Sequence, residues 1–579
     1  MIEIKRRPLT DIGQLPDSMS PLLRRIYAAR GIDSMSMLER SAKGLFAPKQ
    51  LFGIERAASL LFDAVKRQQR IIIVGDFDAD GATSSALSVL ALRMLGMSNV
   101  DYLVPNRFED GYGLSPEVVD QALELNAELI MTVDNGVSSL SGVKYAKEKG
   151  LVVVVTDHHL PGAELPIADA IVNPNLHECD FPSKALAGVG VAFYLMLALR
   201  AQMRTSGWFQ AQGIAEPNLS ELLDLVALGT VADVVPLDQN NRILVHQGLQ
   251  RIRAGKVRPG IQALIEVAKR NPSRLVASDF GFALGPRINA AGRLDDMSFG
   301  VELLMCNNIH AARRMASELD GLNHTRREIE EGMKQEAMAF CERLQFDDKQ
   351  EMPFGLALFQ ADWHQGVIGI LASRIKDQFH RPVIAFASGG DGIIKGSCRS
   401  IVGVHMRDLL DRIDVQNPGL ILKFGGHAMA AGLSINEVDY DRFCTLFDQA
   451  VRQEIDEDAL RGVVLSDGEL TPEEFSMHTA HDIRSGGPWG QAFPEPIFDG
   501  EFKVLNQKLV GEKHLKLIVE PIFKGHNSNV MLDAIAFNVD LRRWPDASAK
   551  SVRMAYRLDI NEFRGNQSLQ LMVEVLEAP

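Results

Sequence analysis

The chain has 579 residues, of which 46% are hydrophobic and 23% are charged, and its formal net charge at pH 7 is −14. This composition excludes a disordered protein, and the length exceeds what one hydrophobic core supports, so several domains are expected. The excess of acid argues against nucleic-acid binding over the whole surface, because phosphate binding depends on Lys and Arg.

The first 70 residues differ in charge from the rest, with 13 Lys and Arg against 7 Asp and Glu. A locally basic groove is therefore compatible with the negative total. No apolar signal core follows the N-terminal charges, and the longest apolar stretch, residues 185–199, is too short to span a bilayer. The five cysteines contain no Cys-x-x-Cys pair, which argues against structural zinc and a disulfide framework and predicts a cytoplasmic protein.

Residues 71–172 alternate short β-branched runs with helical stretches. This alternation predicts a parallel sheet in a doubly wound α/β domain. The expected strands and helices are, in chain order, strand 71–74, helix 82–95, strand 129–133, helix 139–149 and strand 151–155.

Each predicted strand is followed by acid: Asp76, Asp78 and Asp80 after the first, Asp134 after the second, and Asp157 after the third. Ligands bind beyond the carboxyl ends of such strands, so these turns are expected to converge on one crevice. If the first turn is extended, its three carboxylates share one face and repel each other unless a cation lies among them.

Imidazoles and a further acid add to this set. His158 and His159 follow Asp157, and Asp233 follows the apolar stretch 225–232, which is interpreted as a fourth strand. Such oxygen-rich and Asp/His sites favour magnesium, manganese or another transition ion. The competing interpretation has no metal: the first acidic turn caps a helix, Asp134 lies in an ordinary turn, and His158 is a structural histidine. It requires that acids or imidazoles follow four separate strands by chance.

The second half of the chain predicts a charged connecting helix over residues 311–346, then a second α/β unit with strands 354–359 and 382–387 around helix 367–378. Two glycine-rich segments, residues 396–400 and 425–432, are interpreted as loops whose donors suit phosphate, or simply as tight turns. The tail alternates as short strands do, which predicts a small β-barrel of the OB-fold kind that commonly holds single-stranded nucleic acid.

The ordered motifs resemble the DHH phosphoesterase family, and within it the bacterial single-strand-specific 5′-to-3′ DNA exonucleases, over nearly the whole chain. The motifs are at residues 75–81, 104–107 with 111–113, 134–136, 157–159, 228–233, 285–293, 363–369, 397–400 and 425–427. The resemblance implies a basic segment (1–70) packed on a DHH domain (71–310), a connecting helix (311–346), a DHH-associated α/β domain (347–455) and an OB-fold single-strand-binding region (456–579).

The resemblance also implies roles for individual residues. Two divalent ions, Mn²⁺ or Mg²⁺, are held by Asp78, Asp80, Asp134, His158 and Asp233. Asp134 bridges the ions, Asp76 lies beside the first ion, and His159 faces the scissile phosphate. DNA phosphates are gathered by Arg107, Arg287, Ser397, Arg399 and His427, and capture of the terminal 5′ phosphate sets the polarity.

By the same resemblance, the expected protein is a monomer that releases 5′-mononucleotides in recombinational and mismatch repair, with a helicase and a single-strand-binding protein as partners. Three alternatives remain. A manganese pyrophosphatase or small-oligonucleotide phosphodiesterase shares the acid motifs but not the β-rich tail. A non-catalytic scaffold predicts eroded metal ligands, and an unrelated two-domain metal hydrolase leaves the barrel unexplained. Preference for long strands over small phosphates separates the first alternative from an exonuclease.

Overall fold

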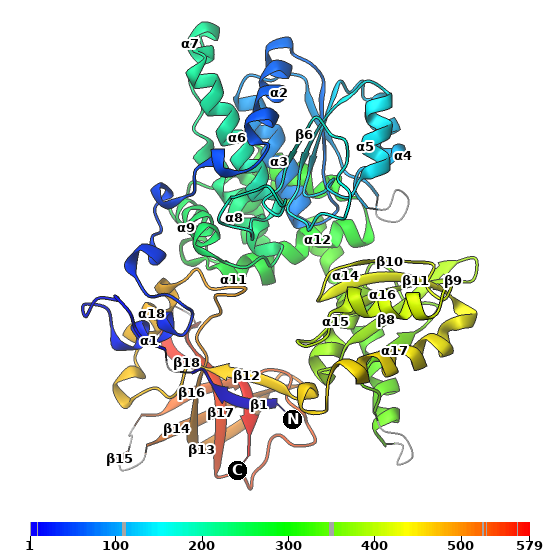
Figure 1. The fold of residues 1–579 in the computed structure, drawn as a ribbon. Coiled ribbons are helices and arrows are strands. Elements are labelled where there is room, and N and C mark those ends of the chain that lie inside the picture. Colours follow the sequence, from blue (N-terminus) through cyan, green and yellow to red (C-terminus); the bar gives the residue numbers. More distant parts are fainter. Residues whose placement is uncertain are drawn as a thin grey trace. The chain divides into compact units, whose positions relative to one another are not determined.

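The computed structural model of the chain describes residues 2–8, 10–106, 112–346, 352–523, 526–527, 530–563 and 565–578. The chain divides into two compact units (Figure 1). The larger unit combines Arg6–Asn323 with Ser466–Pro579, and the smaller unit combines Met1–Lys5 with His324–Leu465. The chain therefore passes between the two units after Lys5, after Asn323 and after Leu465.

The larger unit contains a five-stranded parallel sheet in the order β3-β2-β4-β5-β6. The strands are β2 (Ile71–Val74), β3 (Val100–Leu103), β4 (Leu129–Val133), β5 (Val152–Thr156) and β6 (Ala170–Val172). All residues of β2 and β4 are buried, as continuous apolar strands covered on both faces should be. The three predicted strands are confirmed, whereas the short strands β3 and β6 were not predicted.

Helices cover both faces of this sheet (Figure 1). Ile71 and Ile73 of β2 pack in one core with α2 (Ile54–Arg67), α3 (Ala79–Met94) and α6 (Gly188–Thr205). Ile72 and Val74 point to the other face and pack with α4 (Pro116–Glu124) and α5 (Leu140–Glu148). The period of two along β2 thus explains the two helical layers.

A helical region completes the larger unit's α/β part. Its helices are α8 (Leu223–Ala232), α9 (Gln239–Arg253), α10 (Pro259–Val267), α11 (Ala277–Asp279), the π-helical turn η6 (Phe280–Leu284), α12 (Gly285–Leu294), α13 (Ser298–Met305) and the first part of the long α14 (Ile309–Phe346), whose remainder from His324 belongs to the smaller unit. The prediction of a fourth strand at 225–232 was wrong, because this stretch lies in α8. Residues 223–230 of α8 are all buried, and such a helix has no polar face to distinguish it from a buried strand.

The tail forms a β-barrel. Its strands are β13 (Phe498–Val510), β14 (His514–Phe523), β16 (Leu532–Ala536), β17 (Ser551–Phe563) and β18 (Asn566–Glu577), in the order β13-β17-β18-β16-β14. Pairing of β13 with β14 closes the barrel, as expected for an OB-fold. Helix α18 (Met477–Gly486) precedes it, and the short β15 (His526–Asn527) extends β14.

The N-terminal segment contacts both parts of the larger unit. In α1 (Pro21–Ala28), Leu22 and Ile26 belong to the barrel's core, whereas Tyr27 belongs to the core of the α/β part. The Tyr27 hydroxyl also donates to the Gly486 carbonyl at 2.9 Å. The segment expected to pack on the α/β domain therefore packs on the barrel as well.

The smaller unit has a mixed sheet in the order β10-β11-β9-β8-β7. Its elements are β7 (Leu356–Phe359), α15 (Ile368–Phe379), β8 (Val383–Gly390), β9 (Ile393–Arg399), α16 (Met406–Gln416), β10 (Lys423–Gly426), β11 (Ala430–Asn436), α17 (Tyr440–Glu454), and β12 (Gly462–Ser466) paired with β1 (Ile2–Arg6).

The interpretation of residues 396–400 and 425–432 as loops was wrong for most of their length, which lies in β9, β10 and β11. At Gly396, within β9, glycine permits close packing rather than a turn. A Cβ on Gly396 would come within 2.6 Å of the Phe386 ring and 2.7 Å of Leu433 Cδ2. Sequence alone cannot separate a glycine required by packing from one required by a turn.

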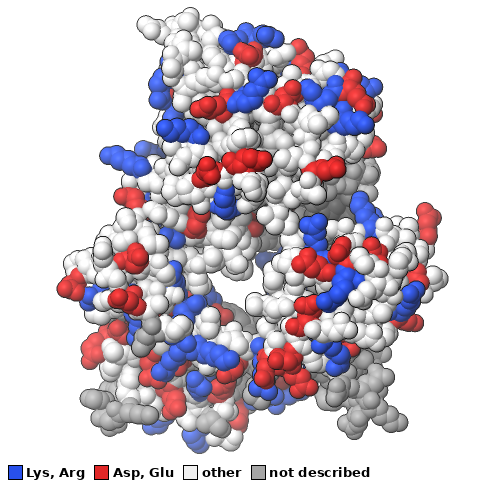
Figure 2. Space-filling model, in the orientation of Figure 1, with Lys and Arg blue, Asp and Glu red and all other residues white. Residues whose placement is uncertain are grey.

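Charges are mixed on the molecular surface. Basic and acidic side chains are interspersed over the face shown in Figure 2, so the negative total is not spread as a uniform acidic field there. Among the residues with described placement, no helix is long and apolar enough to cross a membrane.

Candidate metal centre

The acidic residues lie where the strand order of the parallel sheet reverses. The chain passes from β2 outward to β3 and then returns to β4 on the other side of β2. Asp76 and Asp78 follow β2, Asp134 follows β4, and residues 157–159 follow β5. Open α/β sheets bind ligands beyond the carboxyl ends of their strands at such a reversal, so these residues lie where a ligand is expected.

The first acidic turn is not extended over its full length, contrary to expectation, because α3 begins at Ala79. Asp78 is the N-cap of this helix, and its Oδ1 accepts hydrogen bonds from the amides of Asp80 at 2.9 Å and Gly81 at 3.0 Å. The capping interpretation therefore holds for one carboxylate. The positive end of the helix dipole also favours negative charge in this turn.

Asp80 lies in the first turn of α3 and is fully buried. Its carboxylate accepts hydrogen bonds from the amides of Gly188 at 2.6 Å and Val189 at 3.0 Å, at the beginning of α6. Close packing holds this arrangement, because a Cβ on Gly188 would lie 2.5 Å from that of Asp134. The start of α6 thus holds Asp80 against the carboxylate that follows β4.

Three groups of side chains have ligand atoms within 4.8 Å of one another. They are Asp76 with Asp78 and Asp134, Asp80 with His158 and Asp233, and Asp134 with His158 and His159. The first two groups have no member in common, and the third joins Asp134 of one to His158 of the other. This geometry supports two adjacent cation positions with Asp134 between them.

The atoms at this junction lack hydrogen-bond partners. Asp134 Oδ1 and His158 Nε2 are buried, lie 3.1 Å apart, and make no hydrogen bond with the described residues. His158 Nε2 also lies 3.5 Å from Asp233 Oδ2. The His158 ring bonds the backbone of Leu186 through its other nitrogen, and burial lowers its pKa to about 4. A neutral imidazole nitrogen directed at carboxylates fits a metal ligand, and the oxygen and nitrogen donors suit Mn²⁺ or Mg²⁺.

The carboxylates are poorly stabilised as anions without a cation. Burial, and then the charge of Asp78, raises the pKa of Asp80 to about 7. Burial and the charge of Asp80 raise the pKa values of Asp134 and Asp233 well above the ordinary range. Asp233 also caps the carboxyl end of α8, where the helix dipole disfavours an anion. A bound cation would offset this repulsion.

Stability should therefore depend on pH and on metal. The folded metal-free protein binds these protons more tightly than the unfolded chain, so the cluster's contribution to the free energy of unfolding is lost as pH rises from about 4 through 7. In EDTA, the melting temperature should fall less between pH 5 and pH 8 for Asp134→Asn than for the wild type. Mn²⁺ at pH 8 should raise it for the wild type only.

Asp101→Asn is the matched control, because Asp101 lies on β3 and pairs with Arg70 at 3.3 Å, away from the cluster. This variant should follow the wild type in both comparisons. Equal pH dependence in wild type and Asp134→Asn, or no effect of Mn²⁺ on the wild type, would contradict the assignment of a metal centre.

His159 is held by Asp157, which sequence analysis placed among the converging acids but gave no role. Asp157 Oδ1 accepts from His159 Nδ1 at 2.8 Å and from the amides of His158 and His159, while its Oδ2 accepts from the Val137 amide at 2.8 Å. Burial disfavours protonation of His159, but the hydrogen bond to Asp157 and the nearby carboxylates outweigh it and raise its pKa to about 9. His159 is thus oriented by Asp157, and in the metal-free protein the raised pKa favours its protonated form near neutral pH.

Roles at the site were not predicted for three residues, Tyr112, Asn289 and Gly292. The Tyr112 hydroxyl lies 3.4 Å from His159 Nδ1, and Asn289 of α12 accepts from the Ala79 amide at 2.7 Å. Gly292 of α12 lies so close to the chain that an added Cβ would be 2.0 Å from the Phe77 carbonyl oxygen. These residues lie in the motifs 111–113 and 285–293, on which the family resemblance rests. The motifs did not show which side chains or backbone atoms these residues contact.

Of the two phosphate ligands predicted in the larger unit, the structure describes Arg287 only. Arg287 of α12 donates to Asp320 at 2.8 Å and to the Ala283 carbonyl at 2.6 Å, which fixes its guanidinium. Arg107 lies outside the described residues. The role of both residues toward phosphate remains a prediction.

The other three predicted phosphate ligands lie in the smaller unit. Ser397 and Arg399 are two positions apart on β9 and therefore lie on the same face of the strand. Arg399 Nη1 donates a hydrogen bond to Ser397 Oγ at 3.2 Å. The amide of His427 donates to the carbonyl of Ala430, which pairs with Arg399 in the sheet. A Cβ on Gly369, at the start of α15, would lie within 3.0 Å of both Ser397 Oγ and Arg399 Nη2. A helix N-terminus beside an arginine and a hydroxyl suits an anion.

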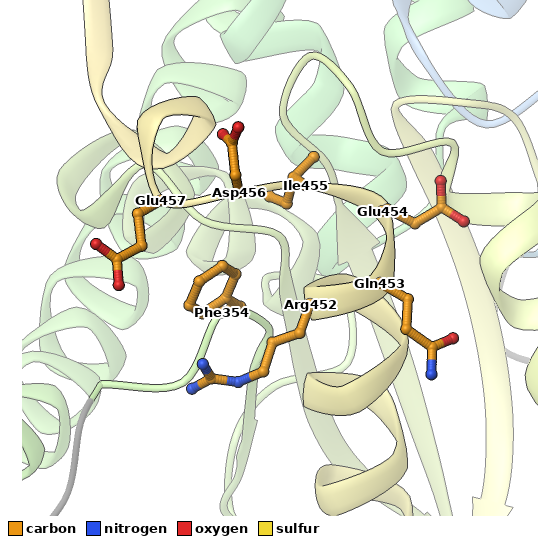
Figure 3. Close-up of a pocket in the computed structure, with 7 residues that line it drawn as sticks. All are labelled: Phe354, Arg452, Gln453, Glu454, Ile455, Asp456 and Glu457. Atoms are coloured by element: carbon orange, nitrogen blue, oxygen red, sulfur yellow. The ribbon is translucent and has the colours of Figure 1, made fainter.

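A pocket at the end of α17 does not bring several charged side chains together on one point. It is lined by Phe354 and by residues 452–457. Figure 3 shows the carboxylates of Glu454, Asp456 and Glu457 directed away from one another. Arg452 lies over the Phe354 ring at 4.2 Å and donates to Asp448, so its charge already has a structural use.

Known protein families match three segments of the chain. Residues 70–230 match the DHH family, N-terminal domain; residues 352–453 match the DHHA1 domain; and residues 466–575 match the RecJ OB domain. This order confirms the expected succession of a DHH domain, a DHH-associated domain and an OB-fold barrel.

Individual relatives extend over the full chain. The single-stranded-DNA-specific exonuclease RecJ of Escherichia coli (strain K12) is 61% identical over 573 residues, which are 99% of this chain and 98% of that protein. The protein of the same name from Bacillus subtilis (strain 168) is 31% identical and is 70% covered. The crystal structure of RecJ from Thermus thermophilus in complex with Mn²⁺ matches with a TM-score of 0.79 at 28% identity, covering 100% of this chain and 80% of that chain. Its complex with Mg²⁺ has a TM-score of 0.75.

Proposed function

The chain belongs to the RecJ family of single-stranded-DNA-specific exonucleases, and from this premise we propose that it hydrolyses single-stranded DNA from the 5′ end and releases 5′-mononucleotides. The observation that best supports hydrolysis at this site is the junction of two ligand groups at Asp134 and His158. A scaffold that only bound DNA would have no need for unpartnered buried ligand atoms at this junction.

The residues divide the work of catalysis. We assign Asp76 and Asp78 with Asp134 to one divalent ion, Mn²⁺ or Mg²⁺, and Asp80, His158 and Asp233 with Asp134 to the other. When bound, such ions activate the attacking water and stabilise charge on the phosphate. His159, held protonated by Asp157, donates to the phosphate and neutralises charge that develops there.

The smaller unit recognises the 5′ end in this proposal. Ser397, Arg399 and His427 bind the terminal phosphate, and capture of that phosphate sets the 5′-to-3′ polarity. The support is the grouping of Arg399 and Ser397 at the N-terminus of α15, together with the family resemblance. Arg287 and Arg107 then bind phosphates nearer the metals.

Arg399→Ala should weaken use of the 5′ phosphate. We expect kcat/KM on a 5′-phosphorylated strand to fall by about 10- to 100-fold, because one charge-assisted contact is lost. The loss on a 5′-hydroxyl strand should be smaller, so the preference for phosphate should shrink. Arg412→Ala, in the same unit, removes an arginine paired with Glu454 and serves as control. An unchanged phosphate preference in Arg399→Ala would exclude the end-binding role.

The cellular setting is also proposed. We place the enzyme in the cytoplasm as a monomer in recombinational and mismatch repair, supported by the resemblance and by five free cysteine thiols. A single strand must first be exposed, which implies a helicase and a single-strand-binding protein as partners. Digestion of a duplex that begins only when a helicase is added would support this order of events, and digestion without one would contradict it.

Digestion of a long single strand labelled at either end tests the main proposal. We expect Mn²⁺- or Mg²⁺-dependent release of the 5′ label as a mononucleotide, no release in chelator, and no attack on blunt duplex. Release from the 3′ end would overturn the polarity. Preference for pyrophosphate or dinucleotides would move the function to a small-substrate phosphoesterase, and no cleavage would move it to a scaffold.

A further inference from the structure

A large aromatic side chain stands exposed near the metal centre. Phe282 of η6 is 80% exposed, whereas Phe280, Ala283 and Leu284 of the same turn are buried. Isolated exposed apolar residues are ordinary on protein surfaces, so exposure alone carries no meaning. The position of Phe282 in the fold is what makes it informative.

The turn that carries Phe282 packs on the end of α8. A Cβ on Gly281 would lie 3.6 Å from Val231 Cγ1, and one on Gly285 would lie 3.1 Å from Ala232 Cβ. Asp233, which belongs to the candidate metal centre, follows Ala232 directly. Phe282, next to Gly281, therefore leaves the surface close to the metal ligand of α8. π-Helical turns are frequent at functional sites.

A second exposed apolar residue follows Asp233 itself. Val234 is 62% exposed and has φ +61°, a left-handed conformation that is rare for a β-branched residue. Such backbone strain persists only where the surroundings impose it, and it concentrates at functional sites. Phe282 and Val234 thus place exposed apolar surface on the turn that packs against Val231 and Ala232 and on the residue that follows Asp233.

A fixed positive charge accompanies this apolar surface. Arg287, in the first turn of α12, donates to the Ala283 carbonyl of the Phe282 turn at 2.6 Å and to Asp320 at 2.8 Å. Its guanidinium is therefore tied to the turn that presents the aromatic ring. An arginine for the backbone and an aromatic ring for a base are the two groups that sites for single-stranded nucleic acid combine.

We propose that Phe282, flanked by Val234, is a stacking platform for a nucleobase of the single strand beside the metal centre. This inference rests on the proposed function and adds to it the contact that holds a base. An exonuclease that degrades any sequence needs a contact common to all bases, and the face of the base is such a contact. Phe282 acts as a positioning residue, because a stacked base keeps the next phosphate in register with the metals.

The first test compares Phe282→Ala with Phe282→Trp on a single-stranded oligonucleotide. Loss of one stacked base should lower kcat/KM by about 5- to 100-fold in Phe282→Ala, and the Trp variant should retain activity near that of the wild type. Phe52→Ala removes a phenylalanine that is 51% exposed elsewhere in the same unit and should behave as wild type. Melting temperatures of all variants should agree, since the ring is exposed.

The second test removes the base instead of the ring. Oligonucleotides carrying one abasic nucleotide at successive positions from the 5′ end should be cut more slowly by the wild type at one position, and Phe282→Ala should show no such penalty. In chelator, 2-aminopurine at that position should be quenched on binding to the wild type and less so on binding to Phe282→Ala. Equal abasic penalties and equal quenching in both proteins would overturn the inference. A wild type inactive on every strand would instead overturn the proposed function.

Discussion

Replacement of Asp134 by alanine is expected to lower hydrolysis of single-stranded DNA by at least about 1000-fold while leaving strand binding largely intact. Asp134 is the carboxylate that approaches both ligand groups, and its Oδ1 faces His158 Nε2 at 3.1 Å. Its removal therefore disturbs both cation positions at once. Turnover with saturating Mn²⁺ and strand affinity in chelator measure the two effects separately.

A backbone effect must be separated from the loss of the ligand. Asp134 has φ +62°, which alanine adopts poorly and asparagine adopts well, so Asp134→Asn keeps the conformation and removes only the charge. Both variants should lose activity, and Asp101→Asn should retain it. Retained turnover in Asp134→Asn would rule out the arrangement of two cations about this residue.

Replacement of His159 by alanine is expected to lower kcat by about 100- to 10,000-fold with little change in metal affinity. His159 Nδ1 is hydrogen-bonded to Asp157 at 2.8 Å. We therefore expect the charge of His159 to act on the phosphate rather than to hold the ions. Isothermal titration with Mn²⁺ and single-turnover hydrolysis distinguish these roles. A parallel loss of metal affinity and rate would show that His159 is a metal ligand instead.

The partner of His159 gives a matched test. Burial lowers the pKa of His159, and the hydrogen bond and charge of Asp157, together with the nearby carboxylates, outweigh it. Asp157→Asn removes that charge, so in the metal-free protein the pKa of His159 should fall from about 9 toward its ordinary value of about 6.5. The fraction of His159 that is protonated at pH 8 should drop accordingly. Histidine NMR resonances in EDTA follow this titration directly, and an unchanged midpoint would contradict the assigned cause.

Much of the fold was predictable from residues 71–155, because continuous apolar strands between helical stretches allow few arrangements other than a covered parallel sheet. The acids that follow the strands were likewise visible, since parallel strands bring their carboxyl ends to one edge. Two parts of the fold were predicted wrongly. Helix α8 is buried on all sides, so its sequence lacks the polar and apolar periodicity of an exposed helix. Gly396 lies in strand β9, where glycine is required for packing and not for a turn.

Contacts in the site could not be predicted where the partner is a backbone amide far away in the sequence. Asp80 and Asp78 are two residues apart, but one accepts amides at the start of α6 and the other caps its own helix. The Gly188 amide that fixes Asp80 lies 108 positions further along the chain. No local pattern encodes such a partner.

The sequence by itself determined which ligand types follow the strands, the order of the three domains and the family, because these depend on residue identity and on neighbours along the chain. Only the tertiary structure decided that Asp157 holds His159, that Asp233 ends a helix, and that the turn carrying Phe282 packs on the end of that helix. Those facts depend on packing and hydrogen bonds between segments far apart in the chain, which the free energy of the whole fold selects.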